Sequence, residues 1–232
     1  MYKDKKILAI IPARGGSKGI KNKNLKKIKK KSLVCRAIEF CKNQKQIDHI
    51  IVSTDSLKIK NETEKNGIKV PFLRPKKLSG DKISDYDVLI DTLKKSEIFF
   101  NTHFDLITML QPTSPQRTTK EFLNCLKKIN NKKIDAIWTV NKVDKKFHPL
   151  KQLIKNNKSF SFFDKKGEKI IRRQQLKHTF IRNGAVYIFT RNCLVKHKNI
   201  YGKKLDLLIS KINHISIDTY SDLSKVQKLI TK

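Results

Sequence analysis

No stretch of this sequence approaches the roughly 20 consecutive apolar residues that a membrane-spanning helix requires. Residues 1–6, MYKDKK, also lack the apolar segment of a signal peptide. The chain has no internal repeat and no linker long enough to divide it. Its 232 residues can bury a substantial core, so we expect a single domain over residues 1–232 that is soluble, cytoplasmic and without a membrane partner.

Cysteine is scarce and is not spaced for metal binding. No two cysteines form a CxxC pair, and all lie in apolar, partly helical surroundings: Cys35, Cys41, Cys125 and Cys193. Such thiols are typical of buried positions in a protein of a reducing compartment. The pattern therefore argues against a zinc site.

Acidic residues are few, because 20 Asp and Glu stand against 53 Lys and Arg, for a net charge of +33. Clustered positive charge suggests nucleic-acid binding. Here, however, the excess is mostly lysine spread along the chain, with only short blocks such as Lys26–Lys31, and no aromatic residues alternate with the basic ones to make a stacking platform. We interpret the charge as a solvated surface that attracts small anionic substrates. Nucleic-acid binding stays open as an alternative.

Strand-like and helix-like segments alternate along the chain. Apolar strand-like runs lie at 7–13, 49–54, 70–73, 106–110, 135–140, 185–189 and 214–217. Segments with helical periodicity separate them. This alternation predicts an α/β fold in three layers, with a mostly parallel sheet covered on both faces.

Three helices can be placed by their caps and apolar faces. Ser32 caps the first, and either Thr118 or Thr119 begins the second. The third covers 221–230, with Asp222 near its start, where a carboxylate favours the helix dipole. The residues expected to face inward are Leu33, Ala37, Phe40 and Cys41 in the first, Phe122, Leu123, Leu126 and Ile129 in the second, and Leu223, Val226, Leu229 and Ile230 in the third.

Residues 145–182 interrupt the alternation. They contain a short β-like run at 159–163 and turn signals at Asn156-Asn157 and Lys166-Gly167, but no helix-strand unit. The segment is predicted to be an inserted β-rich excursion. Its apolar side chains, Phe160, Phe162 and Phe163, need a cover, for which a second subunit is a candidate.

The stretch AIIPARGGSKGIKNKN, residues 9–24, runs from a strand into a basic, glycine-rich loop. Ligands of open α/β sheets bind at the carboxyl ends of strands, where this loop lies. Gly15, Gly16 and Gly19 let the backbone approach phosphate oxygens, and Arg14 and Lys18 supply charge. The spacing is neither that of a Walker loop nor GxGxxG. By itself the loop is equally consistent with a basic surface turn.

Further motifs identify a family resemblance. IIPARGGSKGIKNKNL resembles the nucleotide-binding signature of the acylneuraminate cytidylyltransferases, which make CMP-sialic acid and related CMP-sugars. More matches follow in order over nearly the whole chain: IIVSTDS (50–56), VPFLRP (70–75), LQPTSPQRT (110–118), RNGAVYIF (182–189) and SIDTYSDL (216–223). The resemblance implies a Rossmann-like sheet of the nucleotide-diphospho-sugar transferase type, and a homodimer in which the excursion crosses over.

The implied activity is transfer of CMP from CTP to the anomeric hydroxyl of a nine-carbon 2-keto-3-deoxy sugar acid, with release of pyrophosphate. Family enzymes for an eight-carbon keto acid have a pattern resembling RxxSxRLPGKPL, from which RGGSKGIKNKN departs. Two alternatives of another class remain, a catalytically weakened nucleotide binder and the nucleic-acid-binding protein.

The resemblance assigns residues to the nucleotide. Arg14, Lys18 and Lys23 surround the phosphates and act in catalysis together with Asp218. The implied nucleotide-binding set is Ala13, Arg14, Gly15, Gly16, Ser17, Lys18, Lys23, Asn24, Arg74, Asp81 and Ser84. Lys82 and Asp85 depart from the family pattern in the loop that contacts the base and ribose. The residues Ser53-Thr54-Asp55 suit either ligand contact or capping of the next helix.

The resemblance also assigns residues to the acidic sugar. They are Gln111, Thr113, Ser114, Arg117, Arg173, Arg182 and Asn183. Gln111–Pro115 is equally consistent with an ordinary proline turn. Gly184 permits close approach of the backbone, and His148 is interpreted as a loop residue rather than a catalyst.

Magnesium is the implied cofactor, with one departure. The family usually has Asp-Ile-Asp-Thr where this chain has Ser216-Ile217-Asp218-Thr219. Two carboxylates at alternate positions of a strand share a face and suit a hard cation. Only Asp218 remains as a carboxylate ligand, and Ser216 offers a neutral oxygen. We therefore expect a weakened metal site.

Overall fold

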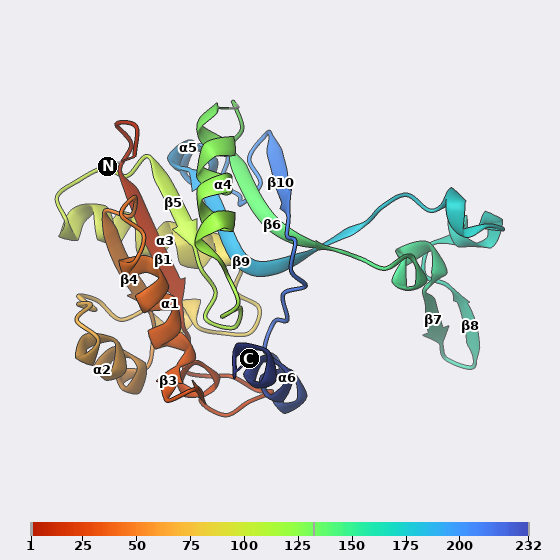
Figure 1. Ribbon diagram of the computed structural model, residues 1–232, viewed down its shortest axis with the longest axis horizontal. Coiled ribbons are helices and arrows are strands. Elements are labelled where there is room, and N and C mark those ends of the chain that lie inside the picture. Colours follow the sequence, from red (N-terminus) through yellow and green to blue (C-terminus); the bar gives the residue numbers. More distant parts are fainter. Residues whose placement is uncertain (1, 132, 232) are drawn as a thin grey trace.

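The computed structural model describes residues 2–131 and 133–231. Its centre is a six-stranded sheet in the order β10-β6-β9-β5-β1-β4 (Figure 1). The strands are β1 (Ile7–Pro12), β4 (His49–Ser53), β5 (Leu106–Met109), β6 (Ala136–Lys142), β9 (Phe180–Thr190) and β10 (Leu205–Ile209). β1 pairs in parallel with β4 and β5, and β10 with β6, whereas β9 runs antiparallel to β5 and β6. The predicted mostly parallel sheet is confirmed.

Alternate side chains of β1 enter two separate cores, one on each face of the sheet. Ile7, Ala9 and Ile11 pack with α1 (Leu33–Lys42), α2 (Leu57–Lys65) and α4 (Thr119–Asn131). Leu8 and Ile10 pack with α3 (Asp85–Phe99) and α5 (Arg191–Val195). Burial of apolar surface on both faces is the main stabilisation of such a sheet. The three-layer prediction is therefore confirmed.

Within residues 2–131 and 133–231, every helix is too short or too polar to span a bilayer.

The predicted caps are present. The Ser32 hydroxyl accepts a hydrogen bond from the backbone N–H of Cys35 (3.3 Å) at the start of α1. Before α4, Thr118 accepts from the N–H of Glu121 (3.2 Å), and the Glu121 carboxylate accepts from the N–H of Thr118 (3.1 Å). This reciprocal pair is a capping box, which satisfies two N–H groups that the first turn leaves without partners. All four cysteines are buried and free, as expected.

Two of the residues expected to face inward do not. The Leu123 side chain on α4 is 37% exposed, because it follows the fully buried Phe122 and is turned about 100° away from it on the helix. Leu229 is 52% exposed on α6 (Tyr220–Thr231). Helix α6 packs against a small cluster through Leu223 and Val226, so its buried stripe is narrower than the apolar pattern suggests.

The strand predictions fail at three places. Residues 70–73 form no strand, because Pro71 has no N–H to donate to a ladder. Residues 214–217 are also outside any strand, since Gln116 accepts from the N–H of Ile215 (3.0 Å) and Thr113 from that of Ile217 (2.9 Å). The strand of the central sheet that was missed is β10, which lies at an edge of the sheet and is only partly buried.

An extension, residues 143–179, leaves the sheet between β6 and β9, and we call it the arm (Figure 1). It holds one hairpin, β7 (Leu153–Asn156) and β8 (Ser159–Phe162), among short 3-10 turns: η3 (Lys145–Phe147), η4 (Pro149–Lys151), η5 (Lys165–Lys169) and η6 (Arg173–Gln175). The arm is thus poorer in strand than expected, and residues 180–182 belong to β9. Large apolar side chains are exposed along it: Phe147, Leu153, Phe160, Phe163 and Ile171.

The loop after β1 is joined to the C-terminal segment by a third, small core. This loop contains η1 (Lys23–Leu25) and leads into the short pair β2 (Lys27–Ile28) and β3 (Lys31–Ser32). The cluster consists of Ile20, Ile28, Leu33, Ile217, Leu223 and Val226. It holds residues 216–218 beside the glycine-rich loop.

The three glycines of the loop differ in what surrounds them. A Cβ on Gly19 would lie 2.5 Å from the backbone oxygen of Asp218, and one on Gly15 would lie 2.9 Å from Cβ of Ser56. Among the described residues, nothing lies within 4 Å of a Cβ on Gly16. Close packing of the chain therefore requires Gly15 and Gly19, whereas Gly16 borders open space.

We predict that Gly19→Ala lowers the free energy of unfolding by about 1–3 kcal/mol, because the new methyl group must displace the Asp218 backbone. The matched variant Gly16→Ala has room and no positive φ. It should leave stability within about 1 kcal/mol of the wild type or slightly above it. Urea unfolding without nucleotide measures both. Equal stabilities for the two variants would contradict the described packing of the loop.

Candidate functional site

A cleft of about 670 Å³ opens at the carboxyl ends of β1 and β5. Four chain segments line it: the loop after β1, the loop and helix start around residues 74–88, the turn after β5, and the C-terminal segment. The lining residues are Pro12, Arg14, Ser17, Lys18, Gly19, Lys23, Asn24, Arg74, Leu78, Gly80, Asp81, Ile83, Asp85, Val88, Gln111, Pro112, Thr113, Ser216 and Asp218. The cleft thus lies where open α/β sheets bind ligands.

Hydrogen bonds fix the loop after β1 along its length. The N–H of Ala13 donates to the Ser53 carbonyl (2.9 Å), and the N–H of Gly15 donates to the Asp55 carboxylate (2.8 Å). The Asn24 side-chain amide donates to the carbonyl of Arg14 (2.9 Å). Asp55 therefore fastens the loop, and Asn24 does so from the wall of the cleft. Neither alternative for residues 53–55 describes what the structure shows, because none of the three lines the cleft and the cap of α2 is Ser56.

Three cations of the loop face carboxylates. Arg14 and Lys18 both pair with Asp81, at 2.8 and 2.5 Å, and Lys23 pairs with Asp218 at 2.8 Å. The hydrogen bonds from Lys18 and then Arg14 lower the pKa of Asp81. Because the carboxylates of Asp81 and Asp218 are 42% and 67% exposed, water screens these pairs, which are therefore weak and exchangeable. An anionic ligand can therefore take over the same cations.

Arg74 is the buried cation of the cleft. Its guanidinium donates to the hydroxyl (3.1 Å) and the carbonyl (2.6 Å) of Ser53 at the end of β4. Burial lowers the pKa of Arg74. An arginine held this firmly presents its remaining N–H groups in a fixed direction.

Ser216 and Asp218 line the cleft together, while Ile217 between them is fully buried in the third core. The predicted shared face is therefore present, although the segment is not a strand. The Asp222 carboxylate accepts from the N–H of Thr219 (2.9 Å) before α6, as expected of a residue at a helix start. Gly19 and Ser216, which the sequence places in the loop and beside Asp218, also line the cleft, whereas Asp85 was not predicted to belong to the site.

No group of three or more His, Cys, Asp or Glu side chains in the described ranges could hold a metal ion. Mg²⁺, however, usually binds through one or two carboxylates together with substrate phosphates and water. The Asp218 carboxylate is 67% exposed at the cleft, with Ser216 beside it. This donor set fits Mg²⁺ that arrives with a nucleotide, and it does not fit a metal bound by protein groups alone.

Asp85, in the first turn of α3, is the unexpected acid of the cleft. Desolvation by burial raises its pKa, an effect that Arg182 and then Arg74 partly oppose. Arg182 lies 3.8 Å from the Asp85 carboxylate and 5.3 Å above the Trp138 ring. The sequence marked Asp85 only as a departure from the family pattern.

Gln111 and Thr113 line the cleft as predicted, but three other residues assigned to the sugar lie beneath it. Ser114 donates to the carbonyl of Asn183 (2.7 Å), and Asn183 is buried against Thr139 and Asn141. Arg117 donates to the carbonyls of Ala185 and Gln111, and burial lowers its pKa to about 10. The polar groups of these side chains form hydrogen bonds that hold the turn after β5 and the start of β9 together. The three residues therefore support the cleft rather than line it.

Gly184 serves the same turn. It has a φ of +70°, and a side chain there would collide with Gln111 and Ser114. The predicted close approach of the backbone is therefore present.

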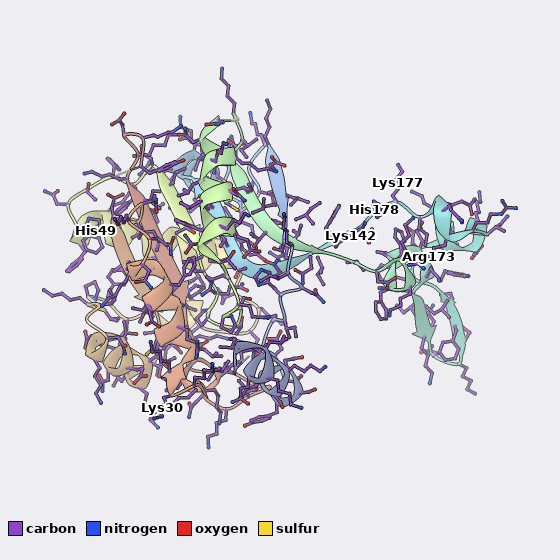
Figure 2. The ribbon with its side chains drawn as sticks, viewed as in Figure 1. Lys30, His49, Lys142, Arg173, Lys177 and His178 are labelled. Atoms are coloured by element: carbon purple, nitrogen blue, oxygen red, sulfur yellow. The ribbon has the colours of Figure 1, made fainter. Side chains whose placement is uncertain are left out.

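The other predicted residues also have definite places. Ala13, Gly15 and Gly16 shape the loop without lining the cleft, and Ser84 caps α3 by accepting from the N–H of Asp87 (3.1 Å). Arg173 lies on the arm, away from the sheet (Figure 2), where it pairs with Asp144 at 3.2 Å. Within one chain the structure does not bring Arg173 to the cleft.

Comparison with known proteins identifies relatives over the whole chain. The family model described as cytidylyltransferase matches residues 8–232. The chain is 32% identical to CMP-N,N'-diacetyllegionaminic acid synthase of Campylobacter jejuni, over 97% of this chain and 95% of that protein. It is 31% identical to post-translational flagellin modification protein B of Campylobacter coli, over 97% and 94%.

A solved structure shows the same fold. CMP:2-keto-3-deoxy-manno-octonic acid synthetase complexed with CTP matches 97% of this chain and 98% of that chain, with a TM-score of 0.72 and 16% sequence identity. At that identity the likeness concerns the fold alone. The family model and the two Campylobacter relatives carry the assignment, and this chain belongs to the cytidylyltransferase family.

Proposed function

We propose that this protein transfers CMP from CTP to the anomeric hydroxyl of a nine-carbon 2-keto-3-deoxy sugar acid and releases pyrophosphate. The observation that carries the proposal is the convergence of Arg14, Lys18, Lys23 and Asp218 in one cleft. Relatives named for legionaminic, pseudaminic and acylneuraminic acids support the nine-carbon acceptor. The four buried cysteines are free thiols, as is typical of proteins in a reducing compartment. This, together with the use of CTP, supports a site of action in the cytoplasm.

The loop cations are the triphosphate-binding groups in this proposal. Arg14 and Lys18 exchange Asp81 for phosphate oxygens, since a multiply charged phosphate chain binds cations more strongly than one exposed carboxylate. Lys23 acts beside Asp218. As the sugar hydroxyl attacks the α-phosphorus, these groups stabilise the charge that develops on the leaving pyrophosphate.

Magnesium is the proposed cofactor, held by Asp218 with Ser216 as a neutral neighbour. When bound, it neutralises phosphate charge and orients the leaving group. The cleft itself gives a reason for a metal. Asp81, Asp85 and Asp218 all line it and repel a polyanion, and four protein cations offset them only narrowly.

The acceptor sugar binds, in this proposal, at the end of the cleft that Asp85, Gln111 and Thr113 line. Arg182 lies outside the lining, 3.8 Å from the Asp85 carboxylate. Gln111 and Thr113 follow β5, and Arg182 lies on the neighbouring strand β9. The Arg182 guanidinium is about half exposed and held over Trp138, so it can pair with the carboxylate of an acidic sugar.

We also propose a homodimer in which the arm of one copy covers the other. Its exposed phenylalanines lack a cover within one chain, as expected of a surface that is buried on association. The arm also carries Arg173, Lys177 and His178 (Figure 2), so a crossing arm would bring positive charge to the partner's cleft. Arg173 stays a proposed sugar contact only in that arrangement.

We expect pyrophosphate release when the protein is incubated with CTP, Mg²⁺ and at least one of N-acetylneuraminic, legionaminic and pseudaminic acids. Arg14→Ala should lower kcat/KM for CTP by about 100-fold or more, because a charged contact to the reacting phosphates is lost. Lys45→Ala, an exposed lysine before β4, is the control and should change little.

Three results would count against the proposal. Equal losses for Arg14→Ala and Lys45→Ala would remove the loop from the mechanism. CTP binding without turnover would favour the catalytically weakened nucleotide binder. Salt-sensitive RNA or DNA binding without CTP turnover would favour the nucleic-acid-binding alternative.

Ser216→Asp should lower the Mg²⁺ concentration that gives half-maximal activity by several-fold, because it adds a second carboxylate to the face of Asp218. Ser221→Asp adds the same charge at an exposed position of α6 and serves as the control. Titration of Mg²⁺ at saturating CTP measures the requirement. If Ser216→Asp behaves like the control, the proposed metal position is wrong.

Sedimentation velocity should show a dimer for the wild type and a monomer for the double variant Phe160→Ser, Phe163→Ser, which makes the hairpin of the arm polar. Ile98→Ser changes an equally exposed apolar residue on α3 and should leave the dimer intact. A dimer that survives the arm variant would place the interface elsewhere.

A further inference from the structure

Asp85 is the acid of the cleft whose role the phosphate-binding scheme does not explain. Asp81 and Asp218 each face a loop cation at 2.5 to 2.8 Å. The nearest cation to Asp85 is Arg182, at 3.8 Å, which is beyond hydrogen-bond distance. The side chain is only 35% exposed. Asp85 is thus more enclosed than the other two acids and has weaker partners.

The Asp85 carboxylate accepts no hydrogen bond within residues 2–131 and 133–231. Ser84 caps the same helix, but it donates to Asp87 (2.7 Å) and leaves Asp85 without a donor. A partly desolvated carboxylate without donors is unfavourable, and the raised pKa of Asp85 agrees with that. A ligand that brings an N–H or O–H group would satisfy it.

The neighbours of Asp85 place it at the acceptor end of the cleft. It lies beside Arg182 of β9, and both charges act on the buried Tyr187 hydroxyl. That hydroxyl accepts from the N–H of Gly184 (2.8 Å), whose carbonyl in turn accepts from the N–H of Gln111 (3.3 Å). The triphosphate cations Arg14 and Lys18 pair instead with Asp81. Asp85 is therefore connected to Arg182 and Gln111, two of the residues assigned to the acceptor sugar in the proposed function.

The pair of Asp85 and Arg182 at the acceptor end of the cleft can recognise two features of a ligand, an anionic group and a hydrogen-bond donor. The guanidinium attracts an anion, whereas an ionised carboxylate only accepts hydrogen bonds and repels a second anion. We propose that Asp85 is a specificity-determining residue, whose carboxylate accepts a hydrogen bond from a hydroxyl or amide N–H of the acceptor sugar while Arg182 binds the sugar carboxylate. This inference rests on the proposed function.

Steady-state pyrophosphate release at varied sugar and varied CTP tests the inference, with the acid that the wild type uses best. Asp85→Asn should raise KM for the sugar by about 10-fold or more, as expected for loss of a charged hydrogen-bond acceptor, and Asp85→Ala should raise it further. KM for CTP should stay within about 2-fold of the wild type. Asp87→Asn, in the same first turn of α3 but absent from the cleft lining, should leave both values unchanged.

The double variant Asp85→Asn, Arg182→Ala shows whether Asp85 contacts the sugar directly or only positions Arg182. If Asp85 binds the sugar itself, Asp85→Asn still raises KM for the sugar in the Arg182→Ala background. If the effect disappears there, Asp85 acts only by holding Arg182, and the inference is overturned. A rise confined to KM for CTP would assign Asp85 to the nucleotide and overturn it as well.

Failure of the inference is distinguishable from failure of the proposed function. An active wild type with an unchanged Asp85→Asn variant overturns the inference alone. A wild type that releases no pyrophosphate with any of the three acids overturns the proposed function and the inference together. Thermal unfolding of each variant shows whether it is folded, and Asp85→Asn keeps the size of the side chain if Asp85→Ala does not fold.

Discussion

The close contact between the glycine-rich loop and the C-terminal segment is the constraint on which the site depends. Gly19 lies against the Asp218 backbone, and Lys23 pairs with the Asp218 carboxylate across 195 residues of sequence. The third core fixes this contact from one side, and the hydrogen bonds from Gly15 to Asp55 and from Asn24 to Arg14 fix the loop from the other. Catalysis by positioning and charge needs this rigidity, because preorganised groups cost no reorganisation during the reaction.

The electrostatics of the cleft differ from those of the whole chain. The net charge of +33 is spread over the surface, whereas the cleft lining holds four cations and three carboxylates. In the described structure, the loop cations are paired with Asp81 and Asp218. In the proposed function, a triphosphate has to displace these carboxylates from the cations, and a metal ion that enters with the triphosphate would remove much of the repulsion between phosphate and carboxylates. The surface charge contributes attraction at long range, which salt weakens.

The sequence was informative wherever one periodicity governs a segment. Alternating apolar runs with caps such as Ser32 and Thr118 were enough to predict the layers, the parallel sheet and three helices. It was less informative where tertiary hydrogen bonds replace regular pairing. Gln116 and Thr113 hold residues 214–217 outside any strand, and the edge strand β10 has too little burial to show a clear pattern. Leu229 was misplaced because the core beneath α6 is small.

In the site, too, some residues could be predicted from the sequence and others depend on tertiary packing. Motif spacing identified the loop, Arg74, Gln111 and Asp218, because these residues belong to continuous signatures at strand ends. Spacing cannot tell which side of a turn a polar residue occupies, and Arg117, Ser114 and Asn183 are in fact on the inner side. Nor can it show that an acid lacks a donor. The position of Asp85 depends on where α3 begins relative to β9, and that is a property of the packed layers alone.

The two ends of the cleft have different structural origins. The proposed nucleotide end is built by β1 and β4, which pair through backbone hydrogen bonds, and by the loop after β1 and the C-terminal segment, which share the third core. The proposed acceptor end lies next to Arg182, which is near the start of β9, just where the chain returns from the arm. Arg182 and Asp85 meet only through side chains at partly exposed positions. Substitutions of these two residues should leave the glycine-rich loop undisturbed, since the contacts that fix that loop lie on other elements. If the proposed function is right, specificity for the sugar and chemistry at the phosphate are thereby carried by different elements of the fold.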